Sequence, residues 1–218
     1  MKKLFVIVFL LVAMVSCKYG LYETGDSELS YLRADFVEAS TNGVGAFTSA
    51  VTDDGVSLTL SPALYVDWKP KARAVYRAML YYDKVENGVT KPISLQSVLL
   101  LKPKTKDEEK EWHTDPLGLE SIWISKNKRY INLSLIIKKG SNTSLSSAQK
   151  IGVLKEAVTK HEKGKAYHFL LTHYQAGQPE YYSVKGYVSI PIYNYHSGDS
   201  LYITVNTYKG KVVKSFLL

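Results

Sequence analysis

The sequence predicts an all-β protein, and two observations support that fold class. The chain has 17 tyrosines among 218 residues, and its valines, isoleucines and threonines stand in short runs. Such residues fit pleated, half-buried strands. In the run Tyr202–Asn206, alternation places Ile203 and Val205 on one face, which is typical of a sandwich strand with one buried side.

The first half of the chain contains five expected strands within a short length of sequence. Asp53-Asp54-Gly55 and Glu86-Asn87-Gly88 mark two of the turns, because Asp, Asn and Gly tolerate positive φ. Five short strands so close together can close a small barrel. The expected strands are Tyr31–Ser40, Gly45–Thr52, Val56–Ser61, Ala74–Val85 and Ile93–Lys102.

A charged stretch divides the two halves. Residues 104–111 are almost all Lys, Asp or Glu and offer nothing to bury, which indicates a domain boundary. We therefore expect one domain over residues 31–108 and a second over residues 109–218. The expected strands of the second domain are Leu119–Ile124, Arg129–Ile137, Val184–Ile190, Leu201–Tyr208 and Val212–Leu217. Lys126-Asn127-Lys128 and Lys209-Gly210 are its tight turns.

The segment 149–163 fits two kinds of secondary structure. Good helix formers follow Ser146 and Ser147, either of which can cap a helix. Ile151 and Val158 also permit a strand, and Gly152 weakens a helix. We favour a strand here because the neighbouring segments are strands.

The N-terminus has the pattern of a secretory signal peptide. Lys2 and Lys3 form a basic head, Leu4–Val15 is an unbroken apolar run, and Cys17 stands where cleavage is expected. At 1.5 Å per residue this run is too short to cross a hydrocarbon core of about 30 Å. The pattern resembles the lipobox of bacterial lipoproteins, in which the cysteine is lipidated. We therefore predict a signal peptide over residues 1–16, lipidation of Cys17 and a tether over residues 17–30.

Longer stretches of the sequence resemble the NigD-like lipoprotein family of Bacteroidetes. The residues that carry the resemblance are Asp115–Ser125, Arg129–Leu133, Gly186–Pro191 and Leu201–Gly210, together with the Asp53-Asp54-Gly55 hairpin. The resemblance implies an OB-like barrel domain followed by an immunoglobulin-like β-sandwich, and it implies no established activity. We expect the protein to be lipid-anchored to the outer membrane. The periplasmic face is favoured because Lys18-Tyr19-Gly20 lacks the acidic run found on many surface-exported lipoproteins.

The net charge is positive and partly clustered. The formal charge of +8 becomes +6 without Lys2 and Lys3. One basic cluster is Lys69, Lys71, Arg73 and Arg77, and the other is Lys102, Lys104, Lys106 and Lys110. Such clusters attract polyanions, but a solvated surface is the more common reason for them. An envelope location leaves little opportunity to meet nucleic acid, so no nucleic-acid partner is expected.

The sequence contains no recognisable catalytic constellation. The Walker A, His-Glu-x-x-His and Gly-x-Ser-x-Gly motifs are absent. His168 and His173 are five apart in a strand-like segment, so they face opposite sides and do not favour a shared metal. The acidic pairs at 53–54 and 108–109 suit a turn and a charged surface better than acid–base chemistry. We therefore predict no catalytic residue, no metal and no cofactor.

Exposed aromatic residues are the strongest candidates for ligand binding, because rings with polar edges stack on sugars and fill protein interfaces. The candidates are Tyr65 and Trp68, beside the first basic cluster, and Tyr181, Tyr182, Tyr193 and Tyr195. In addition, Asp199-Ser200-Leu201 resembles the O-glycosylation motif of Bacteroidetes and makes Ser200 a candidate for modification.

These features predict an envelope lipoprotein that acts as a non-enzymatic binding module. The partner expected first is another envelope protein. The alternative is a glycan or other polyanion that binds through the tyrosines and the basic clusters.

Overall fold

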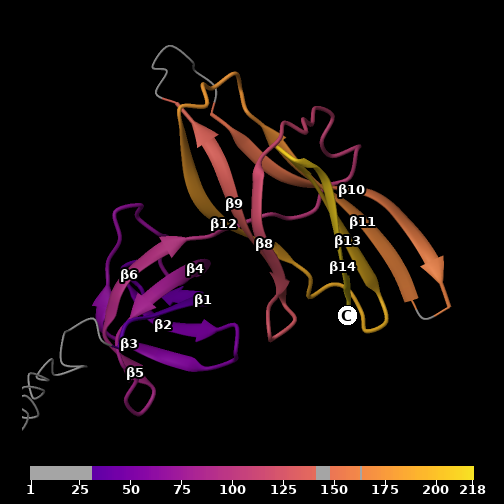
Figure 1. Ribbon diagram of the computed structural model, residues 1–218. Coiled ribbons are helices and arrows are strands. Elements are labelled where there is room, and N and C mark those ends of the chain that lie inside the picture. The colour runs from indigo at the N-terminus through magenta and orange to yellow at the C-terminus, as the bar shows by residue number, and fades with distance from the viewer. Residues whose placement is uncertain (1–30, 141–147, 163) are drawn as a thin grey trace, which may run out of the picture. The chain divides into compact units, whose positions relative to one another are not determined.

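A computed structural model describes residues 31–140, 148–162 and 164–218, which form strands and turns and contain no helix (Figure 1). The predicted all-β fold class is therefore confirmed. All strands lie in one compact unit, Arg33–Leu218. Within the described ranges no helix is long and apolar enough to cross a membrane.

Six strands of the first half form one curled sheet. They are β1 (Arg33–Thr41), β2 (Phe47–Thr52), β3 (Ser57–Leu64), β4 (Val75–Tyr82), β5 (Val89–Thr90) and β6 (Pro92–Ser97). Their order in the sheet is β5-β3-β2-β1-β4-β6. Both predicted turns form with positive φ: Gly55 has φ +82° and Gly88 has φ +78°. Alternate residues such as Val37, Leu58 and Leu80 fill the interior of the curl.

The predicted strand Ile93–Lys102 is in fact two strands in two sheets. Residues up to Ser97 form β6, whereas β7 (Leu99–Leu100) pairs with a strand of the second half. Buried Val98 lies at the change: its N–H still bonds Arg77 O, and the N–H of Leu101 bonds Ser189 O. The alternating residues 93–97 continue directly into the apolar residues 98–101, so no turn residue in the sequence marks the change of sheet. The division into two domains at residues 108 and 109 stays a prediction.

The second half forms two four-stranded sheets that enclose one core. Their strands after β7 are β8 (Gly118–Ile124), β9 (Tyr130–Lys139), β10 (Lys150–His161), β11 (Gly164–Tyr174), β12 (Tyr182–Pro191), β13 (Ser200–Thr207) and β14 (Gly210–Leu217). The sheet orders are β7-β12-β9-β8 and β10-β11-β13-β14 (Figure 1). Ile203 and Val205 are buried between the sheets, as their alternation predicts.

The ambiguous segment 149–163 contains a strand. β10 pairs with β11 in antiparallel register from Lys150 opposite Tyr174 to His161 opposite Gly164. Its neighbours therefore decide its structure, and the preference for a strand is confirmed. Cys17 and the predicted signal peptide and tether at 1–30 lie outside the described residues.

Candidate binding surfaces

Strand β12 separates the predicted tyrosines into two groups. Tyr181 and Tyr182 lie at the start of β12 and are exposed, whereas Tyr193 and Tyr195 follow its other end. A ten-residue strand is about 33 Å long at 3.3 Å per residue. One small ligand therefore cannot contact both groups.

Tyr195 belongs to the core. Its ring packs edge-on against Tyr167 at 4.7 Å and against Phe169 at 5.8 Å between centroids. Burial raises the pKa of its phenol to about 12, and the nearby Tyr167 adds to the shift. Tyr193 is exposed and lies 5.7 Å from the Arg129 guanidinium. Of this pair, only Tyr193 has a ring free to meet a ligand.

Tyr65 and Trp68 both lie on the loop between β3 and β4. Tyr65 is 71% exposed, and Trp68 is 40% exposed. One side of Trp68 packs against Phe47 at 5.7 Å and Tyr76 at 5.0 Å. Trp68 therefore supports the curled sheet while offering an edge to solvent.

Hydrogen bonds hold this loop in a defined conformation. The Thr41 hydroxyl donates to Lys71 O at 2.7 Å, and the N–H of Lys71 donates to the Tyr76 hydroxyl oxygen at 2.7 Å. Lys69 and Arg73 have φ of +49° and +53°, in a region that costs an L-residue about 1–2 kcal/mol. The hydrogen bonds fix the backbone of the loop, and two of its residues adopt a strained backbone conformation.

The cations of this loop are not neutralised by their neighbours. Lys69, Lys71 and Arg73 are exposed and form no ion pair with any acidic residue in the described part of the chain. We call residues 65–73 the aromatic–basic loop. The loop also contains exposed Asp67, so its formal net charge is +2 (three basic residues and one acidic), and it carries both aromatic rings.

Arg77, the fourth member of this predicted cluster, is buried instead. Its guanidinium bonds both carboxylate oxygens of Asp53 at 2.6 Å and the Asn132 side-chain oxygen at 3.1 Å. Its Nε donates to the Ser189 hydroxyl at 3.2 Å, and its guanidinium lies 4.1 Å from the Tyr130 ring centroid. These bonds join the curled sheet to strands β9 and β12.

Sequence reasoning missed this network because it treated Asp53 as a turn residue and Arg77 as a surface cation. A signal was present: Arg77 stands in the middle of an apolar strand rather than in a loop. A charged residue in such a position requires a buried partner. The second member of the acidic pair, Asp54, binds exposed Lys126, so the two carboxylates serve separate ion pairs.

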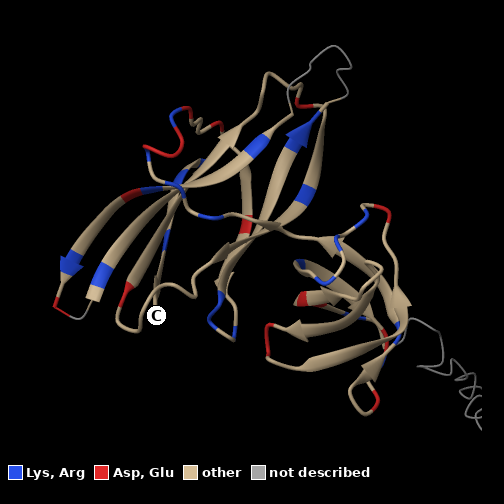
Figure 2. Cartoon of the chain, turned by 180° about the vertical axis from the view of Figure 1, so that it is seen from behind, with Lys and Arg blue, Asp and Glu red and all other residues tan. Residues whose placement is uncertain are grey.

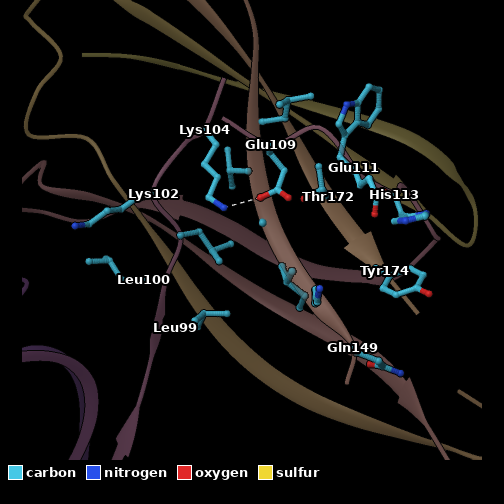
Figure 3. Close-up of a pocket in the computed structure, with 17 residues that line it drawn as sticks. Leu99, Leu100, Lys102, Lys104, Glu109, Glu111, His113, Gln149, Thr172 and Tyr174 are labelled. Atoms are coloured by element: carbon cyan, nitrogen blue, oxygen red, sulfur yellow. Dashed lines mark hydrogen bonds and ion pairs between the residues drawn. The ribbon is translucent and has the colours of Figure 1, made fainter. Parts of the chain in front are cut away.

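The second basic cluster lies beside a pocket of about 660 Å³ (Figure 3). Lys104 Nζ binds Glu109 Oε2 at 2.5 Å, and Lys106 Nζ lies 5.9 Å from the Trp112 ring centroid. Residues 104–111 contain both acidic and basic side chains, and charges of both signs also occur elsewhere on the chain (Figure 2). The pocket is therefore of mixed charge, and the predicted cluster does not form a uniformly positive surface.

The histidines and paired carboxylates do not converge. His168 stacks on Tyr202 at 4.8 Å, whereas buried His173 contacts Asp115 O through Nδ1 at 3.2 Å. The carboxylate of Glu108 accepts a hydrogen bond from the Thr105 N–H, which lowers the pKa of Glu108. Among the described residues no group of His, Cys, Asp or Glu is arranged to hold a metal ion.

Ser200 begins β13 and is half-buried. The preceding Asp199 accepts hydrogen bonds from the N–H groups of His196 at 3.0 Å and Lys165 at 2.8 Å, and the His196 bond is the main reason why its pKa is lowered. Asp199 thus has a structural role here. O-glycosylation of Ser200 stays a prediction, as does lipidation of Cys17.

One side of the sandwich is open between its edge strands β8 and β14. A groove of about 570 Å³ lies between them, and both strands contribute to its walls. Leu119, Ile122 and Val212 line it and are only half-buried. We call this feature the edge groove.

The second half of the chain matches a known domain. Residues 99–217 match the NigD-like C-terminal beta sandwich domain, which is more than half of the 218 residues. The chain belongs to the NigD-like family. This finding confirms the resemblance carried by Asp115–Ser125, Gly186–Pro191 and Leu201–Gly210. The first segment contains β8, the second is the end of β12, and the third covers most of β13 and the turn after it.

Solved structures with a similar fold come from Bacteroides and Parabacteroides species. A NigD-like immunity protein from Bacteroides caccae is 22% identical, with a TM-score of 0.66 over 85% of this chain and 96% of that chain. A "Putative TOXIN related protein" from Parabacteroides distasonis is 16% identical, with a TM-score of 0.63 over 86% and 93%. A "Putative lipoprotein" from Bacteroides fragilis is 10% identical, with a TM-score of 0.53 over 85% and 96%. At these identities the likeness concerns the fold. No curated protein matches the chain.

Proposed function

We propose that this NigD-like chain is an envelope lipoprotein that acts as a non-enzymatic binding module, and that its sandwich binds a protein partner. The signal-peptide pattern and Cys17 support the lipid anchor, as does the name of the Bacteroides fragilis neighbour. The Bacteroides caccae neighbour is named an immunity protein, which supports a binding role. The outer membrane and its periplasmic face are part of the proposal.

The observation that carries the protein-binding role is the edge groove. Edge strands present unpaired N–H and C=O groups, and a partner can satisfy them. Here two edge strands flank a groove whose apolar walls are incompletely covered. A protein chain provides both the backbone hydrogen bonds and the apolar side chains that such a groove lacks.

Site-specific photocrosslinking in intact cell envelopes tests this role. A photoreactive residue at Val213, which is exposed on β14, is expected to capture a defined partner. The matched control is Val44, which is exposed in the turn between β1 and β2. The same adducts from both positions, or none from Val213, would reject the role.

The anchor and its membrane face require their own measurement. Mass spectrometry of the mature N-terminus is expected to find a lipidated Cys17. Protease added to whole cells is expected to leave the protein intact until the outer membrane is broken. A chain that retains Met1 would contradict the anchor, and cleavage on intact cells would place the protein on the cell surface.

A second candidate function is the binding of an anionic glycan by the aromatic–basic loop. The specific observation is that Lys69, Lys71 and Arg73 lack ion-pair partners in the described chain and stand beside Tyr65 and Trp68. Aromatic rings can stack on sugar faces while the cations bind carboxylate or sulfate groups.

Binding to a sulfated polysaccharide at increasing salt tests the second candidate. Binding is expected to weaken with salt because exposed charges are screened. It is also expected to weaken when Lys69, Lys71 and Arg73 become alanine, but not when Lys102, Lys106 and Lys110 do. Tyr65→Ala is a cleaner test of stacking than Trp68→Ala, because Trp68 also packs against Phe47. Equal loss from the two triple variants would show that only net charge matters.

A further inference from the structure

We infer that β14 receives an acidic, extended segment of the partner protein as an added strand, and that this segment covers the edge groove. The inference rests on the proposed protein-binding function and specifies its site and the chemistry of its partner. It follows from three properties of β14: its position, its regularity and its charge.

The position of β14 leaves one long side without a neighbouring strand. β14 is the last strand of the sheet β10-β11-β13-β14 and pairs with β13 from Ser200 opposite Leu217 to Thr207 opposite Gly210. This register has no bulge, so eight consecutive residues present a regular edge. A regular edge of this length is a template for strand addition.

The other edge of the same sheet is less suitable. β10 contains a bulge between Lys155 and Ala157. Part of its edge is already occupied, because Lys104 N–H bonds Val153 O at 2.8 Å and Lys155 N–H bonds Lys104 O at 2.7 Å. Bulges and covering segments both block strand addition. The two edges of one sheet therefore differ, and only β14 remains regular and open over its length.

The side chains of β14 indicate what its partner must bring. Val212, Lys214 and Phe216 stand opposite the buried residues Val205, Ile203 and Leu201, so all three face the core side. Val212 and Phe216 are half-buried, whereas Lys214 is exposed and lines the edge groove. An added strand thus requires apolar residues toward Leu119 and Ile122 and an acidic residue near Lys214.

The charges around the groove favour an acidic partner. Lys209, Lys211 and Lys214 form no ion pair with a described acidic residue. The acidic residue of the groove, Glu120, is already bound by Lys185 Nζ at 2.5 Å and by the Ser134 hydroxyl at 2.6 Å. Three unpaired lysines on one strand and its turn leave the edge positive, which complements an acidic segment.

Lysines on an edge strand can also serve only to prevent self-association. The two roles predict different peptide affinities for the wild-type chain and for the variant in which Lys211 and Lys214 are replaced by glutamate. If the lysines recruit an acidic strand, Lys211→Glu/Lys214→Glu loses affinity for acidic peptides and gains affinity for basic ones. If they only protect the edge, the wild-type chain binds neither kind of peptide.

The test uses an eight-residue peptide, the length of β14, whose groove-side positions are valine except for one glutamate opposite Lys214. The positions on its other face, which lies on the side of Lys211, are glutamate. Fluorescence anisotropy is expected to show binding to the purified wild-type chain, and hydrogen exchange is expected to slow at the amides of β14. The Lys211→Glu/Lys214→Glu variant is expected to bind about tenfold more weakly or worse, a loss of about 1.4 kcal/mol. The matched control is Lys69→Glu/Lys71→Glu, which reverses two exposed, unpaired lysines elsewhere and is expected to bind normally.

Two further peptides complete the test. Methylation of alternate backbone nitrogens keeps the side chains but removes ladder donors, so it is expected to abolish binding. The test peptide with lysine in place of each glutamate is expected to bind the wild-type chain poorly. Protection at another strand, equal binding of the two peptides, or a chain that dimerises through β14 would overturn the inference.

The failure of this inference can be distinguished from failure of the protein-binding function. A Val213 crosslink to a partner segment that is neutral or basic leaves the function intact and refutes the acidic segment. If Val213 captures no partner in the envelope, the function itself fails, whatever the peptides do in solution.

Discussion

Two adjacent aspartates in the β2–β3 turn form ion pairs in opposite environments. Asp53 holds Arg77 by two bonds of 2.6 Å, and the two side chains are 15% and 2% exposed. Asp54 holds Lys126 at 2.8 Å, but these side chains are 49% and 78% exposed. The Asp54 pair joins the curled sheet to the sandwich directly, because Lys126 lies in the β8–β9 turn. The Asp53–Arg77 pair lies within the curled sheet and reaches the sandwich through Asn132 and Ser189.

The difference shows which contacts stabilise the joint between the curled sheet and the sandwich. Around Arg77 stand Asn132 and Ser189, both fully buried, and the Tyr130 ring lies 4.1 Å away. Removing one partner of a buried ion pair leaves an unsatisfied charge, whereas an exposed pair exchanges its bonds with water. Mutations of the two pairs are therefore expected to differ widely in effect.

The largest effect is expected for Arg77→Met, which keeps much of the side-chain volume and removes the charge. Asp53, Asn132 and Ser189 would lose their shared donor, at a cost of about 3–5 kcal/mol in the free energy of unfolding. Urea denaturation followed by tryptophan fluorescence measures this loss.

The double variant Arg77→Met/Asp53→Ala is the control for this prediction. It removes both charges, so it is expected to be less destabilised than the sum of the two single variants. Strict additivity would show that the two side chains do not act as a pair.

A smaller effect is expected for Asn132→Ala. The Asn132 side chain accepts a bond from Arg77 and from the Ser189 hydroxyl at 2.7 Å, and it donates to Asp53 at 3.1 Å. Hydrogen bonds to charged groups contribute about 1.5–3 kcal/mol each, but water can enter the space and replace some of them. The expected cost is about 1–3 kcal/mol, below that of Arg77→Met. An Asn132→Ala variant as unstable as Arg77→Met would show that Asn132, not the charge, dominates.

Tyr130 makes the joint sensitive to alkaline pH. Its hydroxyl donates to Glu38, and burial followed by this hydrogen bond raises its pKa to about 12 from 10.0. Because the pKa in the folded state is the higher one, this contribution is complete below pH 10. It is lost as the pH rises through about 12.

Near pH 11, Tyr130 alone is expected to account for about 1 kcal/mol of lost stability. Tyr130→Phe should therefore show a flatter decline in unfolding free energy between pH 9 and 11. Parallel curves for the two proteins would contradict the assignment. Tyr195, whose pKa is also raised to about 12, provides a comparison outside the joint through Tyr195→Phe.

The comparison also shows what the sequence alone can predict. The turns at Gly55 and Gly88 and the alternation around Ile203 are local, and all three are found in the structure. The partners of Arg77 lie 55 residues away at Asn132 and 112 away at Ser189. Their contact depends on how the curled sheet packs against the sandwich, and no local sequence pattern predicts that packing.

The candidate surfaces follow the same rule. Tyr65 and Trp68 are neighbours in sequence and share one loop, as expected. Tyr182 and Tyr193 are also near in sequence, but the length of β12 separates them. The edge groove was not predicted, because the pattern of β14 identifies a strand but not its place at the edge of a sheet.

The smallest effect is expected for Lys126→Ala. Its Nζ binds Asp54, and this hydrogen bond raises the pKa of Lys126, yet both side chains are largely exposed. Water replaces the lost bond, so we expect no measurable change in the free energy of unfolding at moderate salt. The same measurement on Asp54→Asn should agree. A loss comparable to that of Arg77→Met would mean that the exposed pair holds the β8–β9 turn against the β2–β3 turn. We do not expect this, because the Asn127 N–H already joins the two turns by bonding Asp53 O at 2.9 Å.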